Sequence, residues 1–140
     1  MSTTTAPDDT PAVTALALTS DRLVRDGLRK SFHDQSKVTD ERVAAYHLPL
    51  TTRAGQRAAL QVRAQRHMAR VETLLGRVTQ PALLIWGAED RVILPEDGRR
   101  LQASLPAARL VVFEDCGHLP QEEMPERFAR EVLEFARQLN

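Results

Sequence analysis

Cysteine and aromatic residues are scarce in this 140-residue sequence. The single cysteine, Cys116, rules out a disulfide within the chain and fits a protein of a reducing compartment. Aromatic residues make up 4% of the sequence, and the formal net charge is zero. A protein built mainly to coat nucleic acid is typically basic and stacks bases on aromatic rings. The composition therefore argues against a nucleic-acid partner.

Apolar segments in this sequence are short, and none approaches the roughly 20 residues that a membrane-spanning helix needs. The first 19 residues contain no Lys or Arg, carry Asp8 and Asp9, and include only a brief apolar stretch from Ala12 to Leu18. A secretory signal would begin with basic residues and continue with a longer apolar core. We therefore expect residues 1–19 to be a flexible leader on a cytoplasmic protein that has no membrane partner.

Hydrophobic residues still account for 42% of the sequence, which is enough for a folded core. In residues 20–80 their spacing is typical of helices. Ser20 and Thr39 are suitable N-caps for two helical patterns, and a longer amphipathic pattern runs from about Arg53 to Arg70. We expect this region to be a helical segment.

The pattern changes after Pro81. Ala82–Trp86 and Arg109–Phe113 are apolar runs too short for helices, and each is typical of a strand buried on both faces. Residues 87–108 form a 22-residue connection that contains a helical pattern from Pro95, long enough for a right-handed parallel crossover. We predict an α/β fold class, with a βαβα unit of two parallel strands. Its last helix begins at Pro125 and should turn four apolar side chains inward: Phe128, Val132, Phe135 and Leu139.

Two loops at the ends of these strands carry a carboxylate and an imidazole. Asp90 lies four residues after Trp86, and His118 lies five residues after Phe113. Neighbouring parallel strands lie about 4.8 Å apart and end at the same edge of the sheet, where open α/β sheets bind their ligands. A carboxylate beside one imidazole nitrogen fixes the tautomer and leaves the other nitrogen free to accept a proton. Asp90 and His118 are therefore the candidate catalytic pair.

The segments PALLIWGAEDRVILP (residues 81–95) and ARLVVFEDCGHLPQEEMPERFAREVLEFARQL (residues 108–139) resemble the C-terminal part of the α/β-hydrolase fold superfamily. The preceding helical stretch is similar to the cap that many members place over the active site. The resemblance divides the chain into a leader (1–19), a cap-like segment (20–80) and a core segment (81–140). It implies that Asp90 is the acid and His118 the base of a catalytic triad that hydrolyses a small apolar or ester-like substrate without a cofactor or a metal.

The nucleophile of such a triad has no candidate in these residues. The family's chain order is nucleophile, acid, histidine, with the nucleophile on a Gly-x-Ser-x-Gly elbow. The six glycines stand at positions 27, 55, 76, 87, 98 and 117, and no two are four residues apart. The oxyanion-hole segment has no counterpart either. Loss of one oxyanion donor alone costs roughly 10²–10³ in rate, so we expect no hydrolysis by this polypeptide alone.

Several polar residues around the two loops have a simpler structural interpretation. Glu89, Glu114 and Asp115 are expected to be solvated loop carboxylates. Cys116 lies two positions from His118 in a tight turn, where its sulfur cannot easily reach the imidazole, so we do not expect it to be the nucleophile.

Residues outside the two loops receive similar interpretations. Trp86 is expected in the core at the strand end, with a place in the pocket wall as the alternative. Three histidines share no metal-ligand spacing and are expected to have surface or packing roles: His33, His47 and His67. Four arginines are expected to form a solvated helix face, nucleic-acid binding being the rival interpretation: Arg63, Arg66, Arg70 and Arg77.

Two rival functions follow from the missing nucleophile. The Ala82–Trp86 strand has no candidate neighbour on one side, and such an open edge favours self-association or pairing with a partner chain. The chain is then a non-catalytic remnant or an interaction module. Alternatively, the nucleophile half is a separate polypeptide, and the complemented enzyme binds a small-molecule substrate.

Overall fold

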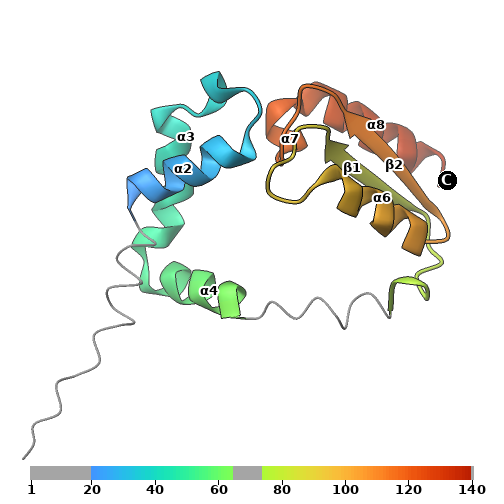
Figure 1. Ribbon diagram of the computed structural model, residues 1–140, viewed down its shortest axis with the longest axis horizontal. Coiled ribbons are helices and arrows are strands. Elements are labelled where there is room, and N and C mark those ends of the chain that lie inside the picture. Colours follow the sequence, from blue (N-terminus) through green and yellow to red (C-terminus); the bar gives the residue numbers. More distant parts are fainter. Residues whose placement is uncertain (1–19, 65–73, 140) are drawn as a thin grey trace, which may run out of the picture. The chain divides into compact units, whose positions relative to one another are not determined.

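The computed structural model describes residues 20–64 and 74–139, and these residues divide into two compact units (Figure 1). The first unit comprises residues 20–26 and 40–64, and the second comprises residues 27–39 and 74–139. Helix α2 (Asp21–Ser31) contributes to both units. The boundary predicted at residues 80 and 81 therefore differs from this division, because residues 27–39 belong with the core segment.

The first unit is helical. It contains the start of α2, then α3 (Asp40–His47), the short 3₁₀ helix η2 (Leu48–Thr51) and α4 (Arg53–Ala64). Ser20 Oγ accepts a hydrogen bond from Leu23 N–H at 3.3 Å and so caps α2, as its residue type predicts. Two ion pairs join α2 to α3, Asp21 to His47 and Arg25 to Asp40, both at 2.6 Å. The predicted continuation of α4 to residue 70 lies outside the described residues.

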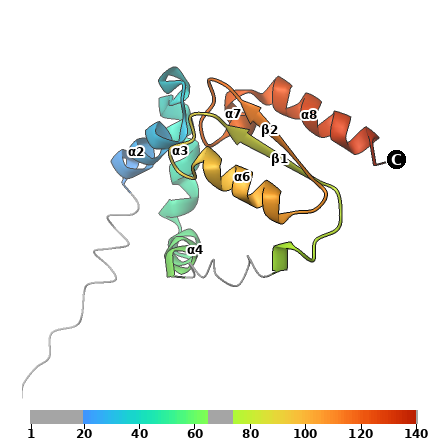
Figure 2. The same cartoon turned by 45° about the vertical axis from the view of Figure 1, so that its right-hand side comes forward.

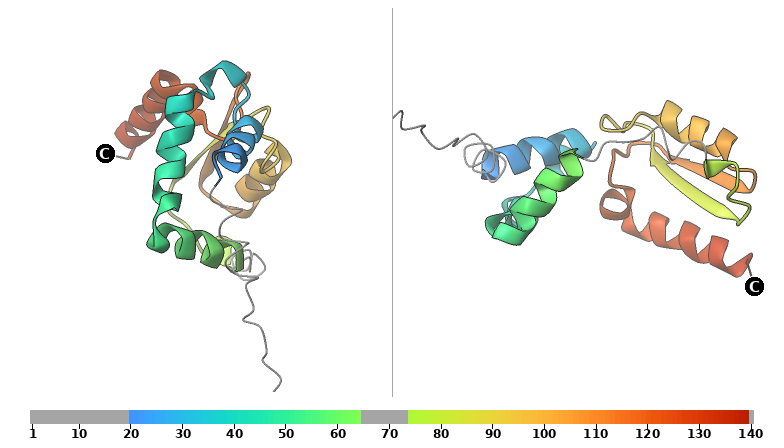
Figure 3. Two further views of the ribbon diagram at one scale, coloured as in Figure 1. Left: turned by 90° about the vertical axis from the view of Figure 1, so that its left-hand side faces the viewer. Right: turned by 90° about the horizontal axis from the view of Figure 1, so that it is seen from below.

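The second unit contains the predicted βαβα arrangement. Strands β1 (Ala82–Gly87) and β2 (Ala108–Phe113) are parallel, with Ala82 opposite Ala108 and Gly87 opposite Phe113. Both strands end at the same edge of the sheet (Figure 2). Helix α6 (Pro95–Ser104) forms the crossover, and α8 (Pro125–Arg137) lies on the opposite face of the sheet (Figure 3, right). The predicted fold class is confirmed.

Two further short helices belong to this unit. The 3₁₀ helix η1 (Gln35–Lys37) follows α2, and the one-turn helix α7 (Pro120–Glu123) lies in the segment for which the sequence predicts only a loop. In all the described residues, no helix is both long and apolar enough to cross a membrane.

Burial in this unit is lower than the sequence predicts. From Ala82 to Trp86 every residue of β1 stays partly exposed, because the sheet formed by the described residues has only two strands. Phe128 and Phe135 of α8 are half-buried, but Val132 is 39% exposed and Leu139 is 53% exposed. The prediction that these last two side chains face inward is wrong, since a two-stranded sheet is too narrow to cover the whole apolar stripe of the helix.

Candidate active site

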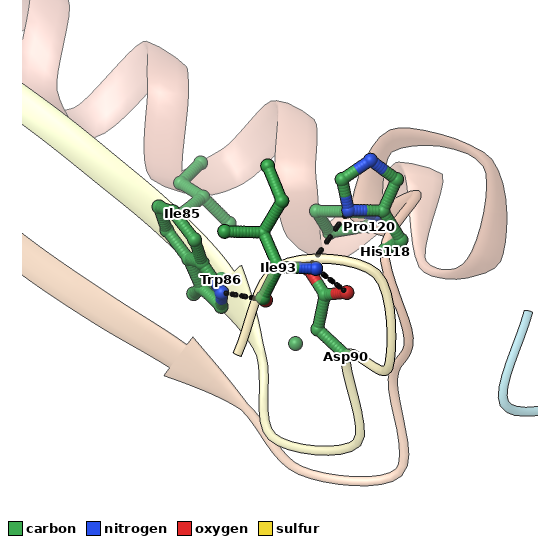
Figure 4. Close-up of a pocket in the computed structure, with 7 residues that line it drawn as sticks. Ile85, Trp86, Asp90, Ile93, His118 and Pro120 are labelled. Carbon is green, nitrogen blue, oxygen red and sulfur yellow. Dashed lines mark hydrogen bonds and ion pairs between the residues drawn. The ribbon is translucent and has the colours of Figure 1, made fainter. Parts of the chain in front are cut away.

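Asp90 and His118 lie in contact at the carboxyl ends of the two strands. The loop after β1 carries Asp90, and the loop after β2 carries His118. The Nδ1 atom of His118 lies 2.8 Å from Oδ2 of Asp90 (Figure 4). The parallel pairing of the strands thus produces the contact that their sequence positions predict, while the catalytic role of the pair stays a prediction.

The carboxylate of Asp90 is held by its own loop. Its side chain is almost fully buried, and Oδ1 accepts hydrogen bonds from the backbone N–H groups of Val92 (2.8 Å) and Ile93 (3.0 Å). These contacts close a local turn of the kind that Asp side chains favour. Oδ1 is therefore occupied by the backbone, and Oδ2 is directed at the imidazole.

The turn that carries His118 is fixed through three consecutive backbone N–H groups. Cys116 N–H donates to Oε2 of Glu89 at 2.9 Å, and Gly117 N–H donates to Oε1 of Glu123 at 2.7 Å. His118 N–H donates to the carbonyl oxygen of Ser31 at 2.6 Å. Three separate segments of the second unit therefore set the backbone from which the imidazole projects.

Glu89 is not the solvated loop carboxylate that the sequence predicts. Its backbone N–H donates to the Cys116 carbonyl at 3.0 Å, and its side chain accepts from Cys116 N–H. This reciprocal pair ties the acid loop to the histidine loop. The prediction failed because the partner lies 27 residues away, whereas Glu114 and Asp115 are exposed as expected.

The sequence interpretation gave Glu123 no role, although this residue ends the Gly-His-x-Pro-x-x-Glu pattern that supports the family resemblance. Its side chain is 3% exposed, and its carboxylate accepts from three backbone N–H groups. Its neighbour Glu122 has the same residue type, so composition does not distinguish the two. The available signal was its position six residues after Gly117, at the end of a turn that begins with Pro120.

The two loops pack against each other without space for side chains between them. A Cβ atom added to Gly87 would collide with the carbonyl groups of Cys116 and Gly117. One added to Gly117 would collide with the carbonyl oxygen of Ser31. Glycine at position 87 therefore permits the close approach of the acid loop to the histidine loop, and glycine at position 117 permits the approach of the histidine turn to the end of α2.

A cavity of about 100 Å³ opens beside the pair. Its wall is mainly apolar, and the other ring nitrogen of His118, Nε2, points away from Asp90 (Figure 4). Trp86 lines this cavity and donates its indole N–H to the Ile93 carbonyl at 3.0 Å, so the alternative interpretation of this residue is correct. The lining residues are Ile85, Trp86, Gly87, Asp90, Ile93, His118 and Pro120. The arrangement is suited to holding a small apolar group near a base.

Cys116 is poorly suited to nucleophilic attack. Its side chain is fully buried, with Sγ 4.0 Å from Oε1 of Glu123. Burial, together with the nearby charges of Glu123 and Glu89, raises the pKa of the Cys116 thiol to about 12. The thiol therefore stays protonated near neutral pH, where only the thiolate would be an effective nucleophile.

The remaining candidates lie away from the pair. His47 is paired with Asp21, and Nδ1 of His33 is buried without a hydrogen-bond partner among the described residues. Within residues 20–64 and 74–139, no three His, Cys, Asp or Glu side chains are grouped to hold a metal ion. Arg77 is exposed. Four predictions fall on side chains outside the described residues: Arg63, Arg66, His67 and Arg70.

Comparison with known proteins identifies the family. The profile described as "Alpha/beta hydrolase family" matches residues 3–131. "Uncharacterized hydrolase YugF" of Bacillus subtilis is 32% identical over 117 residues, which cover 81% of this chain and 43% of that protein. A 2-hydroxy-6-oxononadienedioate/2-hydroxy-6-oxononatrienedioate hydrolase of Burkholderia vietnamiensis is 49% identical over 63 residues, 45% of this chain and 22% of that protein.

A solved hydrolase structure has a similar fold over most of this chain. The meta-cleavage product hydrolase CumD of Pseudomonas fluorescens superposes with a TM-score of 0.72 at 27% identity, over 86% of this chain and 47% of that one. The chain thus spans less than half the length of these relatives. The matched residues include both strands and most of the described helices, and by this match the chain belongs to the alpha/beta hydrolase family.

Proposed function

We propose that Asp90 and His118 are the acid and the base of a nucleophile–histidine–acid triad in a hydrolase. The observation that supports this proposal is the 2.8 Å contact between Nδ1 and Oδ2 at the mouth of an apolar cavity. Asp90 keeps the proton on Nδ1, so that Nε2 is the basic nitrogen. The same carboxylate stabilises the imidazolium that forms when Nε2 takes a proton.

In this mechanism Nε2 of His118 accepts the proton of the nucleophile as the nucleophile attacks the substrate carbonyl. The imidazolium then gives that proton to the leaving group, and the neutral imidazole is restored for attack by water on the covalent intermediate. Asp90 remains ionised throughout. The apolar wall of Ile85, Trp86 and Ile93 favours a small apolar or ester-like substrate, held without a cofactor.

The nucleophile is proposed to come from residues outside this sequence, since these 140 residues contain no elbow and the Cys116 thiol is buried and protonated. We therefore expect the 140-residue chain to hydrolyse a chromogenic nitrophenyl ester no faster than buffer does, and a His118→Ala variant to give the same rate. Turnover by the unaltered chain that disappears in the variant would show that these residues do include a nucleophile.

The roles of the pair are tested by supplying the missing half. In a chimaera, this chain replaces the matching segment of YugF, and a panel of chromogenic esters is screened for the one that the chimaera turns over fastest. Because the amide in Asp90→Asn favours the wrong imidazole tautomer, we expect kcat to fall by about 10⁴-fold, and His118→Ala to be at least as severe.

The exposed carboxylate Glu114 provides a matched control for these variants. Glu114→Gln makes the same acid-to-amide change in the histidine loop and should leave kcat within about twofold. An active chimaera that retains its rate in Asp90→Asn would refute the proposed roles. Adding 2-hydroxy-6-oxo dienedioates to the substrate panel tests the activity by which the relative from Burkholderia vietnamiensis is named.

A second candidate function is association with another polypeptide through the sheet. The observation that favours it is the partial exposure of both strands, from Ala82 to Trp86 and from Ala108 to Val112, in a sheet of two strands among the described residues. Open edges of this kind can accept a further strand. The partner is then either a second copy or the polypeptide that carries the nucleophile.

A further inference from the structure

Glu123 is a buried carboxylate that the proposed proton transfer does not use. Its Oε1 accepts from Gly117 N–H at 2.7 Å. Its Oε2 accepts from the N–H groups of His33 and Asp34, at 2.8 and 3.1 Å. One side chain thus connects the turn that carries His118 to the turn that follows α2, about 90 residues earlier in the sequence.

Backbone hydrogen bonds and a nearby lysine offset the cost of burying the Glu123 carboxylate. Burying an unpaired carboxylate is costly, and a carboxylate that accepts several backbone hydrogen bonds avoids most of that cost. The ammonium group of Lys37 also donates to the backbone carbonyl of Glu123, which brings a positive charge to the same residue. Every contact of the carboxylate with a backbone N–H is a charge-assisted hydrogen bond, the stronger class.

We propose that Glu123 is a positioning residue for His118. Gly117 directly precedes His118. The Gly117 N–H donates to the Glu123 carboxylate, and the His118 N–H donates to the Ser31 carbonyl. Ser31 lies just before His33, to which the Glu123 carboxylate is also hydrogen-bonded. Without Oε1 the buried Gly117 N–H loses its acceptor, and the Cys116–Gly117 peptide is then held only by the hydrogen bond from Glu89 N–H to the Cys116 carbonyl. We expect this peptide to tilt about that remaining bond. The imidazole then leaves the position in which Nδ1 faces Asp90.

This inference rests on the proposed function only for its catalytic consequence, because the positioning itself is measurable in the chain without a nucleophile. Nitrogen-15 NMR of the His118 imidazole distinguishes a protonated Nδ1 from an unprotonated one at neutral pH. In the unaltered chain we expect the neutral ring to carry its proton on Nδ1. In Glu123→Ala we expect the Nδ1–H form to become the minor tautomer, with the signals broadened by exchange.

Two variants show whether the effect is specific. Glu123→Gln keeps one oxygen that can accept from Gly117 N–H, so it should restore a majority of the Nδ1–H form. Glu114→Gln changes an exposed carboxylate three residues before Gly117 and should leave the imidazole spectrum unchanged. A Glu123→Ala variant that is folded and keeps the spectrum of the unaltered chain would overturn the inference.

Amide hydrogen exchange in the unaltered chain tests the same inference if Glu123→Ala does not fold. The amides of Gly117, His33 and Asp34 should exchange at least about a hundredfold more slowly than their intrinsic rates, as expected for buried hydrogen bonds. Exchange of the Gly117 amide at its intrinsic rate would overturn the positioning role.

Failure of the proposed function gives a different result. If Asp90→Asn leaves the His118 imidazole unchanged, the proposed acid does not set the tautomer and the triad fails, whatever Glu123 does. If Asp90→Asn changes the tautomer and Glu123→Ala does not, the triad stands and only the positioning role is lost.

Discussion

Asp90 and Glu123 are both buried carboxylates, and they differ in what surrounds their oxygens. Glu123 accepts from three backbone N–H groups, which do not titrate near neutral pH, and from the Cys116 thiol, so its hydrogen bonds do not involve the imidazole. Asp90 directs one oxygen at backbone N–H groups and the other at His118. The second oxygen therefore faces the group that would change its charge in the proposed proton transfer. One carboxylate is suited to a static role and the other to a catalytic one.

Cys116 lies beside Glu123, and its ionisation should limit stability at high pH. The pKa of its thiol is raised from 9.0 to about 12 in the folded chain, first by burial and then by Glu123 and Glu89. Between these two values the unfolded chain has lost the thiol proton and the folded chain still holds it. The folded state then binds more protons, so the free energy of unfolding falls as the pH rises above about 9.

Urea unfolding followed by circular dichroism at pH 8, 9, 10 and 11 measures this decline. A Cys116→Ala variant has no thiol to ionise, and its midpoint should fall less between pH 9 and 11 than that of the unaltered chain. Parallel declines in the two proteins would show that other groups account for the alkaline destabilisation.

At the scale of elements, the strands and the main helices were predictable from local patterns. The runs Ala82–Trp86 and Arg109–Phe113 are apolar and bounded by turn residues, and they occupy β1 and β2 to within one residue. The one-turn helix α7 was not predicted because four residues carry too little periodicity to distinguish a helix from a loop.

The contact between Asp90 and His118 was predictable for a related reason. It depends on two neighbouring strands and on short loop lengths, all of which are visible in the sequence. The roles of Glu89 and Glu123 depend instead on backbone N–H groups that lie 27 and up to 90 residues away. A local pattern contains only the contact of Glu123 with Gly117, six residues earlier, and none of the distant contacts. Sequence reasoning therefore found the proposed catalytic pair and missed the residues that hold it in place.

The approach of the two loops should be sensitive to a single added methyl group at Gly87. In Gly87→Ala the new Cβ would collide with the carbonyl groups of Cys116 and Gly117, which are backbone atoms and cannot turn aside as a side chain would. We expect the free energy of unfolding to fall by about 1–3 kcal/mol, as in other overpacked sites. Chemical denaturation measures this change, and the His118 imidazole spectrum should also shift.

Gly27 provides the control for this substitution. It lies on the exposed side of α2, and an added Cβ would meet nothing within 4 Å. Because alanine favours a helix over glycine, Gly27→Ala should raise stability by up to about 1 kcal/mol. If Gly87→Ala were as stable as Gly27→Ala, the loops would not be as closely packed as described.

At the scale of the whole molecule, apolar side chains remain exposed that neither of the two units buries in its own packing. The strands of the second unit stay partly exposed, and α8 leaves Val132 and Leu133 accessible. The match covers less than half of each of the relatives YugF and CumD, and the rest of each contains further residues that can cover such surfaces. The 140-residue chain on its own should therefore associate through apolar contact.

Light scattering coupled to gel filtration tests this expectation between about 1 and 100 μM, a range in which weak association through apolar surface becomes visible. The average mass should rise with concentration, and ammonium sulfate should raise it further because it strengthens apolar burial. Association through ion pairs would instead weaken as salt screens the charges.

A Leu133→Lys variant locates the contact: this residue is on α8, away from the strand edges, so association through the sheet should survive the change. Loss of association in Leu133→Lys would assign the contact to α8, and a monomer at every concentration in the unaltered chain would show that the two-stranded sheet is stable without any partner.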